Sequence, residues 1–493
     1  MITDDWDDWF QFSTQYDLRY RDENGDIHDV GQVKIGQFDM AADQRRPDLP
    51  NTFSQLDNRF FSVGQDDSYY QSLNRLGSKV RDEILRGLHD IALDSTLYTR
   101  ALRENVTGTS LLRSVSKATV EIQFRRLARG GRRLSRYHFT YELPSTSRSL
   151  QTPLSLDFEV VPESEPPTNI HVLIGRNGVG KTHLLNHMAR ALADPQADPE
   201  EVGTFTMRGS DRNRLANLVS VTFSAFDPFE PISQPRDRTK VVLPYAYIGL
   251  KRIGSKVDGR PLPPKDPRAL AREFTQSVQV CVQGARLVRW RRALEMLEAD
   301  PIFSDARVAE LAESAADAAD LAERASLLYR NLSSGHKIVL LTITRLVETV
   351  EESSLVLLDE PEAHLHPPLL SAFTRALSDL LINRNGVAVI ATHSPVVLQE
   401  VPRRCAWRLR RSGREVLVEQ PGVETFGENV GVLTREIFGL EVTRSGFHRV
   451  LQEAVEGGAS YEDILERFDG QLGGEARGLI RALVAARIQE GER

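Results

Sequence analysis

The stretch Gly175-Arg-Asn-Gly-Val-Gly-Lys-Thr182 fits the phosphate-binding pattern G-x-x-x-x-G-K-[ST] at every position. It follows a short, mostly apolar run, Ile170 to Ile174, that predicts a buried strand. It precedes apolar residues at helical spacing, from Leu184 to Leu192. This motif requires a strand, a glycine-rich turn and a helix, because the glycines let backbone N–H groups surround an anion at the positive end of the helix. The stretch therefore predicts a site for nucleotide phosphates.

Each residue of this loop has an expected role in the site. Lys181 is expected to reach the outer phosphates, and the Thr182 hydroxyl is expected to ligate Mg²⁺. The remaining positions are expected to line the phosphates through their backbone: Gly175, Arg176, Asn177, Gly178, Val179 and Gly180. The alternative is a chance glycine-rich turn without a ligand, which the two matching flanks disfavour.

The composition is that of an ordinary globular protein, with 40% hydrophobic and 27% charged residues in 493. The net charge of −7 argues against a chain coated in nucleic acid, but not against a local basic groove. Cys281 and Cys405 lie far apart and suggest neither a metal cluster nor a disulfide framework. The acidic start shows no signal pattern, and no run of about eighteen apolar residues occurs. We therefore expect a cytoplasmic protein without a membrane partner.

The order of strand and helix patterns predicts an α/β fold in several parts. Residues 1–165 are expected to form an antiparallel β-subdomain with a helical insertion over about 40–116. A mixed or parallel core sheet is expected in two halves, 166–260 with the phosphate loop and 331–420. A helical lobe over 261–330 separates the halves, and a helical C-terminal region follows over 421–493.

Local patterns predict specific elements in the first part. Asn24-Gly25 between two alternating segments predicts a β-hairpin. The apolar stripe from Leu73 to Ile91 predicts one long amphipathic helix. Alternation then predicts three strands, marked by Val120, Ile122 and Phe124, by Tyr137, Phe139 and Tyr141, and by Leu154, Leu156, Phe158 and Val160.

Two continuous apolar runs, Leu355–Leu358 and Val387–Ile390, predict buried parallel strands. Asp359 and Glu360 follow the first run. A carboxylate oxygen opposite the phosphate loop suits Mg²⁺, so Asp359 is the expected ligand. Glu360 is expected to polarise the attacking water. The alternative is an acidic strand end that only faces solvent.

Two further sites come from strand ends and helix starts. His393 follows the second run, where it is placed to hydrogen-bond a γ-phosphate, although an isolated histidine is often structural. Ser333, Ser334 and Gly335 precede a predicted helix. Ser333 fits either a plain N-cap or a second anion site. Since the chain already has one phosphate loop, such a second site is expected to serve a nucleotide held by another protomer.

Taken in order, these motifs resemble those of the ABC-type ATPase superfamily: Walker A at 175–182, the signature at Leu332–His336, Walker B at Leu355–Glu360 and the switch histidine His393. The run Asp359-Glu-Pro-Glu-Ala-His-Leu-His-Pro367, with Thr392-His-Ser-Pro395, is similar to the non-transporter branch near the RecF and OLD ATPases. That branch includes ATPase subunits of anti-phage systems such as the Septu type. The resemblance covers about 170–410.

The resemblance implies an ABC-type ATPase head that uses ATP and Mg²⁺. In this family two protomers sandwich two ATP molecules, which implies a homodimer. Each ATP would be bound by one phosphate loop and by Ser333 and Gly335 of the partner protomer, while Glu360 and His393 act on the γ-phosphate and the water.

The sequence also departs from the family pattern. The fifth signature position is His336 rather than glutamine or glutamate. No glutamine follows Phe223 where the Q-loop is expected; Ser224-Ala-Phe-Asp227 stands there, with Ser224 as the candidate replacement. His366 occupies the usual position of the D-loop aspartate, and for His364 and His366 we favour an interface role over a zinc site.

Partners are suggested by basic clusters and by what the chain lacks. The favoured basic cluster is expected in a turn between two strands and consists of Arg125, Arg126, Arg129, Arg132 and Arg133. We expect these arginines to form a groove that binds duplex DNA; the alternative is a solvated surface without a ligand. OLD-type relatives carry a Toprim nuclease domain, whereas the region beyond Thr425 is short and helical. We therefore expect a separate effector protein, favour a nuclease, and place the system in anti-phage defence. The alternatives are a RecF-like DNA-repair ATPase and, less favoured, the soluble ATPase subunit of a transporter.

Overall fold

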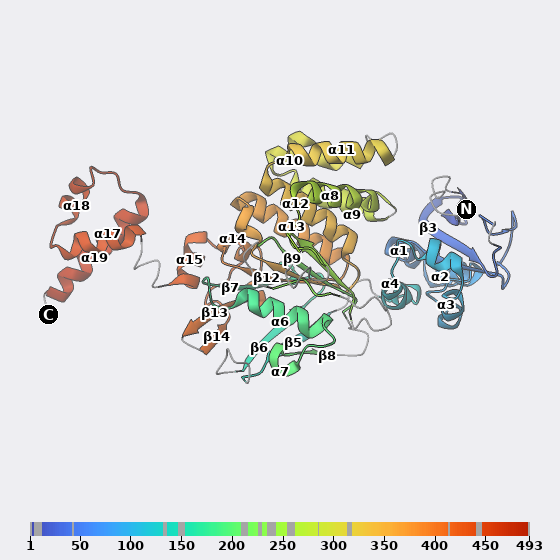
Figure 1. Cartoon of the computed structure of the whole chain (residues 1–493), viewed down its shortest axis with the longest axis horizontal. Coiled ribbons are helices and arrows are strands. Elements are labelled where there is room, and N and C mark those ends of the chain that lie inside the picture. The colour runs from blue at the N-terminus through green and yellow to red at the C-terminus, as the bar shows by residue number, and fades with distance from the viewer. Residues whose placement is uncertain are drawn as a thin grey trace.

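The computed structural model describes residues 2–3, 12–41, 44–131, 136–145, 153–208, 215–224, 229–233, 243–253, 262–283, 285–312, 318–412, 415–439 and 446–491. The chain forms an N-terminal unit at one end, a central α/β core with a helical lobe, and a small helical bundle at the other end (Figure 1). No helix in these ranges is both long enough and apolar enough to cross a membrane.

The N-terminal unit combines an antiparallel sheet with short helices. The sheet has the order β1 (Ile2–Thr3), β2 (Gln15–Arg21), β3 (Ile27–Gln37) and β4 (Phe60–Gly64). The predicted hairpin at Asn24-Gly25 is confirmed, because β2 and β3 pair antiparallel around it. The helices are α1 (Asp67–Arg75), α2 (Ser78–Gly87), α3 (Ser95–Ala101), a π-helical turn (Thr107–Leu111), α4 (Lys117–Thr119), a second π-helical turn (Val120–Phe124) and α5 (Arg125–Ala128).

Two predictions for this unit are wrong. The expected single helix over Leu73–Ile91 is two helices, because Gly77 adopts φ +98° between α1 and α2. The expected strand at Val120–Phe124 is helical, and the helical segment extends to Ala128 rather than Ser116. Val120, Phe124 and Leu127 are all buried, and their spacing of four and three residues places them on one helical face.

The central sheet has seven strands in the order β10-β9-β11-β12-β7-β13-β14. Their bounds are β7 (Ile170–Gly175), β9 (Leu218–Thr222), β10 (Tyr245–Gly249), β11 (Leu355–Asp359), β12 (Val387–Thr392), β13 (Ala406–Ser412) and β14 (Glu415–Glu419). All neighbours pair parallel except β13 and β14, which form an antiparallel hairpin. The predicted α/β class with a mixed, mostly parallel core sheet is therefore confirmed.

A second, three-stranded antiparallel sheet lies beside this core. It has the order β6 (Leu154–Val160), β5 (Tyr137–Leu143) and β8 (Thr204–Arg208). Its first two strands were predicted, but they pair with β8 beyond the phosphate loop instead of extending the N-terminal sheet.

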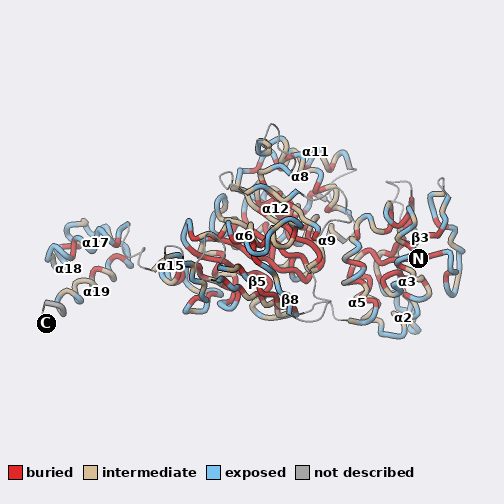
Figure 2. The backbone as a smooth tube through the Cα atoms, turned by 60° about the horizontal axis from the view of Figure 1, so that its bottom comes forward, coloured by how far each residue is buried: buried red, intermediate tan, exposed pale blue. Residues whose placement is uncertain are grey.

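Helices cover both faces of the core sheet, so its strands are buried on both sides (Figures 1 and 2). In β11, Val356 and Leu358 pack into one hydrophobic cluster, whereas Leu355 and Leu357 pack into the other. This explains the continuous apolar run. The first face is covered by α8 (Pro267–Cys281), α9 (Ala285–Leu297), α12 (Ser334–Thr349) and α13 (Pro367–Asn383), and the second by α6 (Lys181–Ala193) and the three-stranded sheet.

The remaining helices complete the lobe and the C-terminal region. A short helix α7 (Pro199–Val202) follows α6, and the lobe also contains α10 (Pro301–Ala306), a 3₁₀ turn (Val308–Ala312) and α11 (Ala318–Asn331). Beyond β12 come α14 (Pro395–Leu398), a 3₁₀ turn (Arg403–Cys405) and α15 (Val430–Phe438). The predicted helical tail is confirmed as α17 (Gly446–Glu456), α18 (Tyr461–Arg467) and α19 (Gly474–Gly491), which share their own small core.

Candidate functional site

The phosphate loop joins β7 to α6 as the sequence predicts. Gly178 and Gly180 adopt φ +80° and +103°, backbone conformations that favour glycine. A side chain at Gly175 would meet the carbonyl oxygen of Leu409 at 2.5 Å, so glycine is also required by the packing of β13. Arg176, Asn177 and Gly178 are exposed at the top of the loop. The turn therefore has the open, N–H-rich form that an anion needs.

Lys181 lies beneath this loop. Its ammonium donates to the carbonyl oxygens of Gly175 at 2.9 Å and Arg176 at 3.1 Å, and the residue is 3% exposed. Burial lowers the pKa of Lys181, although the carboxylates of Glu360, Glu362 and Asp359 act in the opposite direction. A buried cation flanked by carboxylates can bind a phosphate once it exchanges its carbonyl partners for phosphate oxygens.

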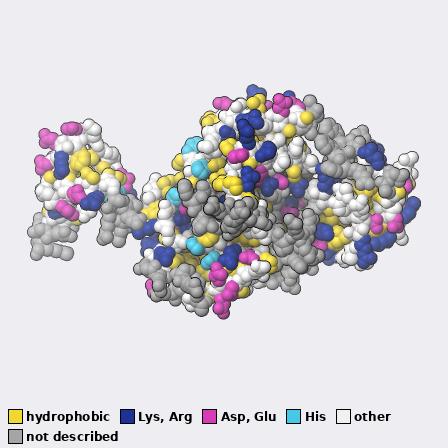
Figure 3. Space-filling view, in the orientation of Figure 1, with side chains coloured by type: hydrophobic (Ala, Val, Ile, Leu, Met, Phe, Trp, Pro, Cys, Tyr) yellow, Lys and Arg dark blue, Asp and Glu magenta, His cyan; other side chains and the backbone are white. Residues whose placement is uncertain are grey.

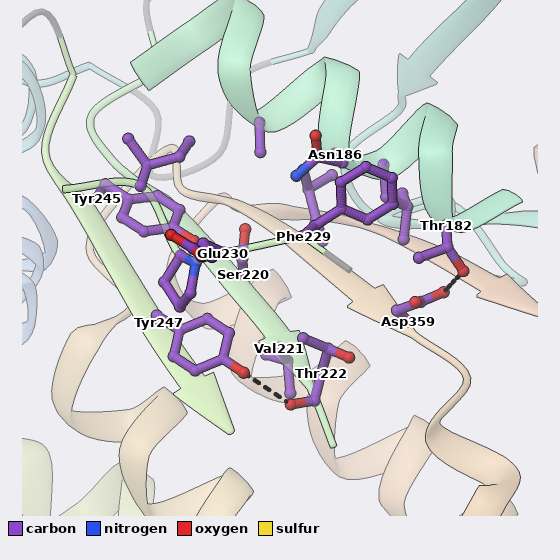
Figure 4. Close-up of a pocket in the computed structure, with 15 residues that line it drawn as sticks. Thr182, Asn186, Ser220, Val221, Thr222, Phe229, Glu230, Tyr245, Tyr247 and Asp359 are labelled. Atoms are coloured by element: carbon purple, nitrogen blue, oxygen red, sulfur yellow. Dashed lines mark hydrogen bonds between the residues drawn. The ribbon is translucent and has the colours of Figure 1, made fainter. Parts of the chain in front are cut away.

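Thr182 and Asp359 come together at the start of α6 and the end of β11. The Thr182 hydroxyl donates to Asp359 Oδ1 at 3.1 Å (Figure 4). Asp359 stands in register with Thr222 on β9 and Ala391 on β12, so three strand ends meet at this point. A hydroxyl and a carboxylate suit Mg²⁺, which usually takes one or two protein oxygens and completes its shell with water and substrate phosphate. The two residues predicted as metal ligands are therefore brought together.

Glu360 extends from the same strand end into the mouth of the site. It adopts φ +47°, and its backbone N–H donates to the carbonyl oxygen of Ala391 at 2.9 Å. One carboxylate oxygen lies 3.9 Å from Lys181 Nζ and 3.9 Å from His393 Nδ1. A partly exposed carboxylate beside a phosphate-binding lysine can accept a proton from water at the γ-phosphate.

His393 is fixed by a residue to which the sequence analysis gave no role. One oxygen of Glu362 accepts hydrogen bonds from the His393 backbone N–H and the Thr392 hydroxyl, both at 2.6 Å, and lies 3.0 Å from His393 Nδ1. The Glu362 side chain is only 7% exposed. Glu362 lies two residues after Glu360. Its place in the run Asp359-Glu-Pro-Glu362 is the local sequence feature that could have indicated a role in the site.

The segment after β9 is where a Q-loop residue is expected. Thr222 ends β9 beside Asp359, its hydroxyl accepts from the Ser224 backbone N–H at 3.3 Å, and its carbonyl oxygen accepts from Tyr247 at 3.2 Å. A pocket at this point is lined by Thr182, Asn186, Thr222, Tyr247 and Asp359, among others (Figure 4). Ala225, Phe226 and Asp227 lie outside the described residues. The role expected of Ser224 therefore stays a prediction. The positions of Thr222 and Asn186 in this pocket were not predicted, because no motif marks them.

The signature segment begins α12 away from the phosphate loop. Ser333 is the N-cap, and its hydroxyl lies 2.6 Å from His336 Nδ1. A side chain at Gly335 would meet the carbonyl oxygen of His364 at 2.4 Å, so the helix start packs directly on the turn after β11. Within the described part of the chain, neither Ser333 nor Ser334 hydrogen-bonds to residues 175–182. Contact of this segment with a partner's nucleotide stays a prediction.

The predicted basic cluster is not a turn between strands. Arg125 and Arg126 belong to α5, and Arg126 pairs with the buried Glu352 of the core. Arg125 lies over the Tyr98 ring, whereas Arg129 is exposed. Arg132 and Arg133 lie outside the described residues. On the face shown in Figure 3, acidic side chains are interspersed among the basic ones over the N-terminal unit and the lobe.

Two comparisons of the sequence find similar proteins. Residues 294–399 match the family described as "AAA domain, putative AbiEii toxin, Type IV TA system", a span that includes the signature segment, Asp359, Glu360 and His393. Protein ea59 of Escherichia phage lambda is 41% identical over 504 residues, which cover 98% of this chain and 94% of ea59.

Two solved structures are more distant. The structure described as "An inward-facing conformation of a putative metal-chelate type ABC transporter" has a TM-score of 0.30 and 15% identity, over 58% of this chain and 83% of its own. The ATP-binding cassette of an ABC transporter in its ADP conformation has a TM-score of 0.32 and 13% identity, over 63% of this chain and 100% of its own. At these scores neither similarity carries an argument.

Proposed function

The chain belongs to the family of protein ea59 of Escherichia phage lambda, and we propose that it binds and hydrolyses ATP between two copies of itself. It contains a P-loop, ABC-like ATPase domain. The observation that carries the proposal is the convergence of Lys181, Thr182, Asp359, Glu360 and His393 at adjoining strand ends.

Each residue of the site has its own proposed role in ATP hydrolysis. Lys181 and the loop N–H groups hold the β- and γ-phosphates. Thr182 and Asp359 would hold Mg²⁺, which would supply neutralisation of the charge on the phosphates. Glu360 takes a proton from the attacking water, and Glu362 holds the His393 ring toward the γ-phosphate. Hydrolysis then removes the group that His393 contacts.

The dimer is supported by the position of Ser333. Its hydroxyl and the N–H groups at the start of α12 form an exposed anion-binding end, yet they make no hydrogen bond to the phosphate loop of the same chain. A second copy can bring this helix start to the ATP held by the first. ATP then closes the dimer, and hydrolysis opens it.

We further propose that this cycle gates a separate effector protein, of which a nuclease is the favoured kind, in defence against phage. The described part of the C-terminal region is helical, and its three-helix bundle has its own core apart from the ATPase sheet. Protein ea59 is encoded by a phage, so the proposed system fits a prophage that protects its host cell from other phages. Pull-down of native partners with Glu360→Gln in the presence of ATP, compared with Lys181→Ala, tests this step.

The ATPase itself is tested with two variants. Lys181→Ala should lose ATP binding, whereas Glu360→Gln should bind ATP, hydrolyse it about 10²–10⁴-fold more slowly and accumulate as a dimer. Lys79→Ala and Glu466→Gln, at exposed positions away from the site, serve as matched controls. Protein that neither binds ATP nor changes when Lys181 is replaced would contradict the proposal.

A further inference from the structure

We propose that Asp300 and His336 are positioning residues that hold the signature serine, Ser333, for the ATP of a second copy. Ser333 Oγ lies 2.6 Å from His336 Nδ1, and His336 Nε2 lies 3.1 Å from Asp300 Oδ1. His336 and Asp300 are 7% and 6% exposed, whereas Ser333 is exposed. The three residues form a chain from the buried interior of the lobe to the anion-binding helix start. This inference rests on the proposed ATP-bridged dimer.

The hydrogen bonds fix the direction of each donor. A carboxylate only accepts, so Asp300 takes the hydrogen on His336 Nε2 and leaves Nδ1 as an acceptor. Nδ1 therefore accepts the hydroxyl hydrogen of Ser333, and this bond fixes the orientation of the serine. When a partner's ATP arrives, the hydroxyl exchanges His336 for a phosphate oxygen from a prepared position. Less side-chain freedom is then lost on closure.

Asp300 also connects this chain to the rest of the site. Its Oδ1 accepts from the backbone N–H of Ile302 at 2.9 Å and so caps α10, and its Oδ2 lies 3.4 Å from His366 Nε2. His366 ends the turn that begins after Glu360. One buried carboxylate thus joins the lobe, the signature helix and the segment after β11. The interface role expected of His364 and His366 stays a prediction, and no group of three metal-ligating side chains occurs in the described ranges.

The test uses the full chain with Glu360→Gln, so that the ATP-bound dimer accumulates. His336→Leu removes the acceptor at Nδ1 and leaves the Ser333 hydroxyl free to rotate, and its dimer should dissociate roughly two- to tenfold more readily, because one more side chain must be ordered on closure. His336→Gln restores an acceptor for Ser333 and a donor for Asp300, and should stay close to the parent. Sedimentation velocity with Mg²⁺ and ATP measures the dimer. Binding of a fluorescent ATP analogue to the monomer should be equal in all three proteins, which excludes a general folding defect.

A double-mutant cycle completes the test. In a Ser333→Ala background, His336→Leu should weaken the dimer no further, because its effect passes through the serine. Independent, multiplicative effects of the two substitutions would overturn the inference, as would a His336→Leu dimer as stable as the parent. Failure of the parent Glu360→Gln protein to dimerise with ATP would instead overturn the ATP-bridged dimer, and the inference with it.

Discussion

The carboxylate of Glu362 lies 3.0 Å from His393 Nδ1 and accepts the backbone N–H of the same histidine at 2.6 Å. It thereby fixes both the backbone and the ring of the residue that faces the expected γ-phosphate. The carboxylate also accepts the Thr392 hydroxyl, so the last residue of β12 is part of the arrangement. A histidine at a strand end can contact a bound phosphate only if its ring is held toward that ligand.

We therefore expect Glu362→Ala to lower kcat for ATP hydrolysis roughly 10- to 100-fold, the effect of a few kcal/mol. ATP binding should be unchanged, because Lys181 and the phosphate loop are not hydrogen-bonded to Glu362. Steady-state ATPase assays and equilibrium binding measure the two quantities. Glu466→Ala, at an exposed helical position, is the control. Equal loss of binding and turnover would contradict a role confined to His393.

The start of α12 and the turn after β11 are in backbone contact at Gly335. A Cβ there would lie 2.4 Å from the carbonyl oxygen of His364, so one of the two segments must move. We expect Gly335→Ala to cost about 1–3 kcal/mol in unfolding free energy and to abolish ATP-dependent dimerisation. Urea unfolding and sedimentation measure these effects. Gly478→Ala, where the added Cβ meets no side chain or neighbouring segment within 4 Å, should leave dimerisation unchanged and raise the unfolding free energy by up to about 1 kcal/mol, as alanine does inside a helix. A fully dimeric Gly335→Ala protein would show that the helix start does not meet the partner's ATP.

Local motifs identified the site because its residues follow strands whose ends meet. The phosphate loop, Asp359, Glu360 and His393 were each predicted from a strand and the residues after it. Contacts between distant segments were not predictable from one sequence. Asp300 is 36 residues from His336, and Arg126 is 226 residues from Glu352. The apolar residues of Val120–Phe124 fit both the two-residue period of a strand and the roughly four-residue period of a helix. The structure shows the helix, in which Phe124 is buried against Tyr70 of α1.

Arg126 joins the N-terminal unit to the core rather than facing solvent. Its partner Glu352 is buried, and burial raises the pKa of that carboxyl to about 7 even though Arg126 opposes the shift. We expect Arg126→Ala to lower the unfolding free energy by about 3 kcal/mol, the lower end for a broken buried pair, because Glu352 can take up a proton. Arg129→Ala, at an exposed position, should change it by less than about 0.5 kcal/mol. Chemical denaturation compares the two variants; a weaker salt dependence of duplex DNA binding with unchanged stability would contradict this role for Arg126.

Asp90 should make the N-terminal unit less stable as the pH rises. Burial raises the pKa of Asp90 to about 7 from 3.8, and its carboxyl accepts from Tyr70 and from the backbone N–H groups of Ala92 and Leu93. Between these pH values the folded state keeps a proton that the unfolded state has lost, so stability falls by up to roughly 1.4 kcal/mol per pH unit.

Urea unfolding at pH 5 and 7.5 should show a smaller decline of the unfolding free energy for Asp90→Asn than for the unmodified chain. Glu352 contributes to the decline in both proteins, so the difference between them isolates Asp90. Asp94→Asn, at an exposed N-cap, should decline like the unmodified chain, and equal declines in all three proteins would show that Asp90 is ionised throughout.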